Sequence, residues 1–267
     1  MSVTRAEHRR HQRREGRRGR PLGWSFAPIV AGLCLGAGSA WLAVAPAGGA
    51  SAPVPNLSAG IARCIRDPAC HQTFVVAHRA EGFGGVENSR AAVLGAVEAG
   101  VPVIEIDLRG SRDGQLFVMH DGKLETTTGG RGRVDQTTAQ EIGHLRLKNG
   151  ETVPRFPDVY AITRGRAVLS VDFKVPAEMM EQTAEWVRDN GSFDDVIFFA
   201  NTGEEIAAAA RTKKRYPEMI VMVRLLDTRV TVQSTRAAFG GRLPEILHTN
   251  RIGADEVAGL HALGVKV

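Results

Sequence analysis

The stretch Val103-Ile104-Glu105-Ile106-Asp107-Leu108 decides the fold of this chain. Its length and its apolar residues are typical of a buried β-strand. Because side chains alternate along a strand, Glu105 and Asp107 leave one face while the isoleucines and the leucine leave the other. Two carboxylates on one buried face repel each other, and isolated buried charges are very costly. The stretch therefore predicts a strand that holds a cation on one face.

Apolar runs and helical patterns alternate on both sides of this strand. We expect strands at residues 73–78, 103–109, 168–174, 196–200, 220–224, 245–248 and 265–267. We expect helices at residues 89–98, 178–190, 204–215, 231–239 and 255–263. This alternation predicts a parallel α/β sheet. Acids and histidines at the carboxyl ends of the strands favour a (β/α)₈ TIM barrel over a doubly wound sheet, because barrel active sites gather there.

The expected barrel is short. Residues 72–267 are fewer than the roughly 250 residues that a TIM barrel usually takes. The seventh strand ends at the last residue, Val267. We therefore expect a barrel truncated before its eighth strand, either as a fragment or as a part that another chain completes. Such a barrel has two unpaired sheet edges.

The amino-terminal segment has two parts. Residues 1–20 hold eight arginines and two glutamates, a surplus of six positive charges in a chain whose net charge is +5. The remainder is close to neutral, so we expect no nucleic-acid partner. Residues 21–47 carry no charge, and their apolar run Trp24–Val44 is about as long as the ~20 residues that span a bilayer. A basic head before such a run predicts a signal peptide or a transmembrane anchor.

From this leader we expect the domain to lie outside the cytoplasm, in the periplasm, in the medium, or anchored to the outer face of the plasma membrane. The composition of residues 48–71 predicts a linker. Cys64 and Cys70 lie at its end. In an exported domain, two nearby cysteines favour a small disulfide loop. Two free thiols or a pair of metal ligands are the alternatives.

Several short motifs then follow in a fixed order. They are His78-Arg79, Glu87-Asn88, Glu105-x-Asp107, Asp113-Gly114, His120-Asp121 and Asp172-x-Lys174. This series resembles the glycerophosphodiester phosphodiesterase family, part of the phospholipase C-like phosphodiesterase superfamily. The resemblance covers about residues 73–267 and is densest in 75–175. It implies a TIM barrel with a small insertion after the second strand, here about residues 116–156.

The resemblance implies that His78 and His120 are the general acid and base. Cleavage of a phosphodiester requires one group that deprotonates the attacking oxygen and another that protonates the leaving alkoxide. Histidine suits both tasks near neutral pH. Taken singly, His78 also fits a core histidine, and His120-Asp121 also fits a turn.

The resemblance also implies a cofactor and a substrate site. Glu105, Asp107 and Asp172 would hold one divalent cation, Ca²⁺ or Mg²⁺, because ligands that are all oxygen suit a hard metal. Arg79 and Lys174 would bind the phosphate, and Asn88 would help to bind the substrate. Without a metal, the alternative is that Glu105 and Asp107 pair with Arg79 and Arg109.

Three positions depart from the family pattern. Ala80 stands where glycine is usual, Val86 where proline is usual, and Asp172 where glutamate is commoner. The aspartate keeps the charge but reaches about one methylene less far. We expect hydrolysis of glycerophosphodiesters to glycerol 3-phosphate and an alcohol. Action on a lysophospholipid or sphingolipid, and an inactive truncated binding remnant, are the alternatives. We leave open whether His248 lines the mouth of the site.

Overall fold

The computed structural model describes residues 56–225, 230–250 and 252–267. The basic head at 1–20 and the apolar segment at 21–47 lie outside the described residues. Among the described helices, none combines the length and the apolarity that a bilayer crossing requires.

The described residues form a seven-stranded sheet. Its strands are β1 (Val76–Ala77), β2 (Val103–Gly110), β3 (Leu116–Val118), β4 (Val168–Phe173), β5 (Val196–Ala200), β6 (Ile220–Arg224) and β7 (Ile246–His248). The spatial order is β1-β2-β4-β5-β6-β7, with each neighbouring pair parallel. β3 is antiparallel to β2. Beyond β7, a parallel bridge joins Ile246 to Lys266. Lys266 lies in the segment 265–267, where the sequence predicts a further strand.

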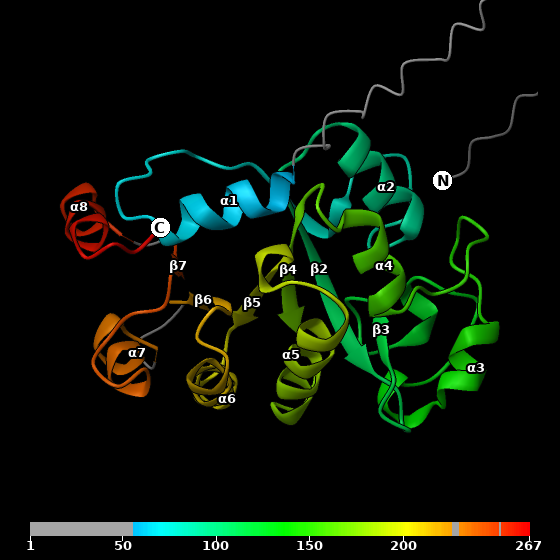
Figure 1. Ribbon diagram of the computed structural model, residues 1–267. Helices are drawn as coiled ribbons and strands as arrows, with labels where there is room; N and C mark the ends of the chain where they lie inside the picture. The colour runs from blue at the N-terminus through cyan, green and yellow to red at the C-terminus, as the bar shows by residue number, and fades with distance from the viewer. Residues whose placement is uncertain (1–55, 226–229, 251) are drawn as a thin grey trace, which may run out of the picture. The chain divides into compact units, whose positions relative to one another are not determined.

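Helices separate the parallel strands. They are α1 (Leu57–Arg66), α2 (Arg90–Glu98), α3 (Ala139–His144), α4 (Phe156–Thr163), α5 (Glu178–Asn190), α6 (Gly203–Arg215), α7 (Val232–Ala238) and α8 (Ala254–Ala262). Short 3₁₀ turns lie at His78–Ala80, Leu124–Thr126, Val134–Gln136 and Phe193–Asp195. Figure 1 shows the helices following the curve of the sheet in chain order, from α2 and α4 near β2 to α7 and α8 near β7. This curled parallel sheet confirms the expected TIM-barrel architecture as a half-barrel.

The register of β2 and β4 separates polar from apolar side chains. Glu105 is opposite Ser170, and Asp107 is opposite Asp172. The alternate residues of both strands, Ile106 among them, are fully buried in the main core with the helices. The predicted strand and its separation of faces are therefore confirmed, with the carboxylates on one face and the main core on the other.

Helix α1 corrects the expected linker at residues 48–71. Asn56 caps the helix by accepting a hydrogen bond from the Ala59 backbone N–H at 3.0 Å. Ile61 and Ile65, one turn apart, pack on the first residues of the central strands, such as Val103. Alanine, glycine and serine had indicated a linker, but the isoleucines gain burial against the sheet, and this packing stabilises the helix.

The insertion after β2 forms as expected. β3 folds back on β2, and the residues that follow have a small core of their own. That core comprises Phe117, Met119, Leu124, Val134, Ala139, Ile142, Leu147 and Val153. Helix α4, which follows the insertion, was not expected. It begins at Phe156 with Pro157 in its first turn, where proline is tolerated.

Cys64 and Cys70 form the expected disulfide, with their Cα atoms 5.3 Å apart. The loop that it closes is tied to the end of the chain. Lys266 Nζ donates to the Asp67 carbonyl at 2.8 Å and to the Cys70 carbonyl. The disulfide loop therefore fixes the sheet segment that lies next to β7.

Candidate active site

Three buried carboxylates meet on the concave side of the sheet. Oxygens of Glu105, Asp107 and Asp172 lie within 4.8 Å of one another. The exposed fractions of these residues are 5%, 1% and 3%. β2 supplies the first two and β4 the third, through the pairing of Asp107 with Asp172. The structure thus brings together the three residues expected to bind a cation.

The turn after β1 brings His78 and Arg79 to this cluster. His78 Nε2 lies 3.9 Å from Glu105 Oε2, and its side chain is largely exposed. The Arg79 backbone N–H donates to the same carboxylate oxygen at 2.9 Å. Arg79 and Ala80 have φ values of 53° and 51°, so the chain takes the left-handed conformation even with alanine in place of glycine. That conformation costs a non-glycine residue about 1–2 kcal/mol.

Arg79 and Lys174 place positive charges next to the carboxylates of Asp107 and Asp172. Lys174 Nζ donates to Asp172 Oδ2 at 2.6 Å and lies 3.7 Å from Asp107 Oδ1. Arg79 Nε lies 3.6 Å from Asp107 Oδ2, and its Nη1 donates to Glu87 at 3.1 Å. Both cations therefore lie where a phosphate near the carboxylates can reach them.

Two asparagine amides hold the aspartates in place. Asn88 Nδ2 donates to Asp107 Oδ2 at 3.0 Å. Asn201 Nδ2 donates to Asp172 Oδ1 at 2.7 Å, so both oxygens of Asp172 have a donor. Asn88 was expected to contact substrate, but its amide is buried against Asp107. Asn201 was not expected at the site. It lies two residues beyond Phe199, which lines the cavity on the concave side, and residues two apart along a strand share a face.

Burial and the neighbouring carboxylates change the acidity of Glu105. Burial, followed by the negative charge of Asp107, raises the pKa of the Glu105 carboxyl to about 7. The hydrogen bond from the Arg79 backbone acts in the opposite direction. Burial of a carboxylate next to like charge disfavours its ionised form. A nearby cation relieves this penalty.

His120 lies on the insertion side of the site. Its Nδ1 is hydrogen-bonded to Asp121 Oδ1 at 2.8 Å, and the imidazole is half-buried. The hydrogen bond to His120 lowers the pKa of the Asp121 carboxyl. An Nδ1–H held by a carboxylate leaves Nε2 available for proton transfer. Met119 N donates to the Asp107 carbonyl at 2.9 Å, which fixes His120 near β2.

The donor set fits one hard divalent cation. Three carboxylates converge on one point, while Arg79 and Lys174 supply two positive charges within 4 Å of them. The alternative to a metal was that Arg79 and Arg109 pair with Glu105 and Asp107. Of these two arginines, Arg79 does contact Asp107. Arg109 instead donates to the carbonyls of His120 and Lys174. Arg79 is also shared with Glu87, so the two cations cannot balance all of these carboxylates when they are ionised, and the remaining negative charge suits a cation.

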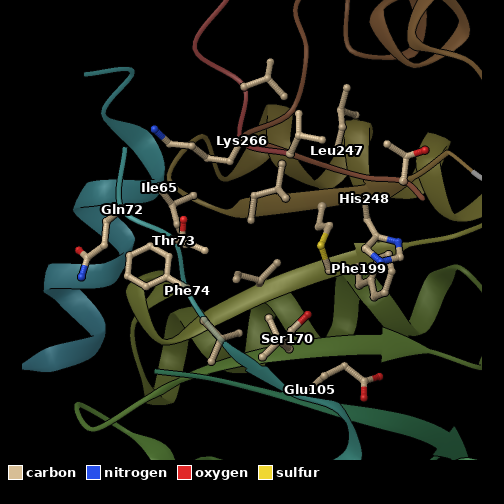
Figure 2. A pocket seen from close by; sticks show the side chains of 18 of the residues that line it. Ile65, Gln72, Thr73, Phe74, Glu105, Ser170, Phe199, Leu247, His248 and Lys266 are labelled. Atoms are coloured by element: carbon tan, nitrogen blue, oxygen red, sulfur yellow. The ribbon is translucent and has the colours of Figure 1, made fainter. Parts of the chain in front are cut away.

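A cavity of about 650 Å³ adjoins the triad. His78, Glu105 and Ser170 are among the polar residues that line it, and much of its lining is apolar. Figure 2 shows Phe199 and His248 next to each other on one side of this cavity, with Glu105 farther along the sheet, beyond Ser170 of β4. The structure thus answers the open question about His248, which lines the cavity.

A parallel α/β half-barrel whose concave side carries a buried carboxylate triad places the chain among α/β-barrel proteins with an acidic cluster that could hold a cation. A sequence profile described as the Glycerophosphoryl diester phosphodiesterase family matches residues 78–253. The chain belongs to this family. The match contains every residue that we expected in the site.

Two curated relatives carry the family name. The glycerophosphodiester phosphodiesterase of Caldanaerobacter subterraneus subsp. tengcongensis is 38% identical over 95 residues, which are 34% of this chain and 39% of the relative. Human glycerophosphodiester phosphodiesterase 1 is 30% identical over 149 residues, or 54% of this chain and 38% of the relative. The chain thus spans about two fifths of the length of these relatives.

Solved structures show the same fold. A glycerophosphoryl diester phosphodiesterase from Parabacteroides distasonis aligns with a TM-score of 0.63 at 22% identity, covering 78% of this chain and 75% of that one. An Oleispira antarctica phosphodiesterase in complex with the product sn-glycerol-3-phosphate aligns with a TM-score of 0.61 at 23% identity, covering 73% and 83%. At these identities the likeness concerns the fold.

Proposed function

We propose that this chain hydrolyses glycerophosphodiesters to glycerol 3-phosphate and an alcohol, and that the reaction depends on a divalent metal. The observation that carries the proposal is the buried triad Glu105, Asp107 and Asp172, with His78 3.9 Å from its first member. Membership of the family and the curated relatives named for this activity support it.

In this proposal, the residues around the triad bind the phosphate. Lys174 and Arg79 present N–H donors beside the carboxylates, and a guanidinium can hold two phosphate oxygens at once. His78 and His120 share the proton transfers. One takes the proton of the attacking oxygen, and the other gives a proton to the leaving alkoxide. His120 has its ring oriented by Asp121 for this task.

Glu105, Asp107 and Asp172 would hold the cation, and Ca²⁺ or Mg²⁺ suits three carboxylates better than zinc does. When bound, the ion supplies positive charge against the phosphoryl oxygens. The raised pKa of Glu105 and the converging oxygens support this assignment.

The purified full chain tests the proposal. Glycerol 3-phosphate released from glycerophosphocholine is measured by a coupled dehydrogenase assay, with Ca²⁺, with Mg²⁺ and with EDTA. We expect activity with at least one metal, its loss in EDTA, and a fall of about 10²–10⁴-fold in kcat for His78→Ala. His144→Ala, on α3 in the insertion, is the matched control and keeps full activity.

Two results would contradict this function. Activity that persists both in EDTA and in His78→Ala would exclude the metal and the histidine from the reaction. An inactive chain that still binds glycerol 3-phosphate would instead support a binding remnant.

A lipid substrate is the second candidate. The apolar lining of the cavity, including Phe74, Met222 and Leu247, favours a substrate with an acyl chain. Turnover of glycerophosphocholine and of lysophosphatidylcholine, measured side by side, separates the two candidates. A kcat/KM that is higher for the lyso-lipid would favour the lipid.

We also propose that the domain acts outside the cytoplasm, as an exported or membrane-anchored protein. The disulfide between Cys64 and Cys70 supports an oxidising compartment. Cell fractionation, followed by amino-terminal sequencing of the mature protein, distinguishes a cleaved signal from a retained anchor. Recovery of the intact chain in the cytoplasm, with both cysteines reduced, would contradict export.

A further inference from the structure

A second polar group lies on the same cavity as the triad, on the strands farther along the sheet. Arg224 is the last residue of β6 and is paired in register with His248, the last residue of β7. Both line the cavity that His78 and Glu105 also line. The mechanism proposed above uses neither residue.

Arg224 is held by an aromatic ring and an imidazole. Its guanidinium lies 4.6 Å from the centre of the Phe199 ring. Its Nε donates to His248 Nδ1 at 3.3 Å. Phe199 and His248 are also in contact with each other, with their ring centres 5.6 Å apart. Among residues 56–225, 230–250 and 252–267, no carboxylate forms an ion pair with Arg224, so none of these carboxylates neutralises its charge.

This group presents donors and a positive charge. An imidazole that accepts at Nδ1 carries its proton on Nε2 when it is neutral. Burial, together with the charge of Arg224, lowers the pKa of His248 and favours this neutral form. The Phe199 face, which could otherwise attract an ammonium group, is already covered by the guanidinium. The group therefore suits hydroxyl, carboxylate or phosphate oxygens and repels cations.

We propose that Arg224, Phe199 and His248 form the subsite for the alcohol part of the substrate, and that it selects neutral polyols or anionic alcohols over ammonium alcohols. This inference rests on the proposed function. All glycerophosphodiesters share the glycerol phosphate part. In the proposed function, the triad with its metal ion, together with Arg79 and Lys174, would hold this part. A cavity of about 650 Å³ leaves space toward β5–β7 for the part that varies.

Two isosteric substrates isolate the charge. Glycerophosphocholine and the glycerophosphodiester of 3,3-dimethylbutanol have the same shape, but only the first carries a quaternary ammonium. We expect the full chain to show a kcat/KM about tenfold higher for the neutral ester, as repulsion at close range would produce. Arg224→Met should abolish the difference, and Arg224→Lys should keep most of it. Arg236→Met, on α7, removes the same charge outside the cavity lining and should leave the preference unchanged.

Isothermal titration calorimetry measures the Kd of each ester, so the charge preference can be tested even if the chain does not hydrolyse either ester. If neither ester is hydrolysed, the proposed function fails, and the ratio of the two Kd values still reports the charge preference. Equal kcat/KM and equal Kd for the two esters in the wild-type chain would overturn the subsite. An Arg224→Met variant that loses activity equally on both esters would also overturn it, because Arg224 would then serve the shared part of the substrate.

Discussion

Asn88 and Asp107 hold each other through a closed pair of hydrogen bonds. The Asn88 amide donates to the Asp107 carboxylate at 3.0 Å, and the Asp107 backbone N–H donates to the Asn88 carbonyl oxygen at 3.1 Å. Asn88 does this with a φ of 60°, a conformation that asparagine tolerates better than most residues. The asparagine of the Glu87-Asn88 motif thus positions Asp107, one of the three carboxylates of the triad.

We therefore expect Asn88→Ala to lower the free energy of unfolding by about 2 kcal/mol, because it removes the acceptor for the buried Asp107 N–H and one donor to its carboxylate, and strains the backbone. Asn88→Gly is the matched control, since glycine adopts positive φ freely and loses the hydrogen bonds alone. Urea denaturation measures the difference, with a smaller loss expected for glycine. Both variants should bind Ca²⁺ more weakly, and wild-type affinity in both would contradict the role given to Asn88.

The acidity of Glu105 predicts a pH dependence in metal-free protein. Its folded-state pKa of about 7 lies above the ordinary value of 4.5, so the folded state holds this proton more tightly than the unfolded state does. The stabilisation is complete below about pH 4.5 and is lost as the pH rises through 7, at up to about 1.4 kcal/mol per pH unit. Urea denaturation in EDTA between pH 5 and 8 should show this fall.

Glu105→Gln should remove that part of the slope, because glutamine does not titrate. An equal slope in both proteins would assign the effect to other groups. The same proton competes with the cation. We expect the affinity for Ca²⁺ in the wild-type chain to rise with pH up to about 7, with release of one proton.

Asn201 should matter for metal binding more than for stability. Its amide orients Asp172, which reaches less far than the glutamate usual at this position. We expect Asn201→Ala to weaken Ca²⁺ binding by about tenfold, the scale typical of groups that orient metal ligands. Asn149→Ala, an exposed asparagine in the insertion, is the control. Unchanged affinity in Asn201→Ala, measured by calorimetry, would leave Asn201 without a role at the site.

The disulfide should stabilise the fold measurably. Closing a loop of this length stabilises a protein by about 2 kcal/mol in the chain-entropy treatment. We expect the Cys64→Ser/Cys70→Ser double variant to lose about this much in urea denaturation, and reducing agent to have the same effect on the wild type. Equal stability of the oxidised and reduced proteins would contradict this.

The sequence predicts the strands and the triad well, because both depend on local patterns. Alternation along 103–108 separates the carboxylates from the core, and the structure has the same division. Helix α1 escaped prediction, since its stability comes from Ile61 and Ile65 packing on distant strand ends rather than from helix propensity. The first strand is shorter than the expected 73–78 and comprises only Val76–Ala77 among the described residues.

The contacts within the site were harder to foresee than the residues in it. Motif order identified Asn88 and Lys174, but their partners depend on the turn after β1 and on the β2–β4 pairing. Asn201 belongs to no motif that we could recognise. Side-chain alternation along β5 was the available signal for Asn201. Phe199 faces the cavity, and Asn201, two residues later and just beyond the end of β5, is expected on the same face.

The pairing of Asp107 with Asp172 has a consequence for how this site can change over time. A single-residue insertion or deletion in β4 ahead of Asp172 would shift the register by one, turn Asp172 toward the core and bring Val171 onto the concave side. The carboxylate triad and the packing of the core around β4 would be disrupted in one event. β4 should therefore tolerate substitutions better than insertions or deletions, because a substitution at 172 still places a side chain beside Asp107.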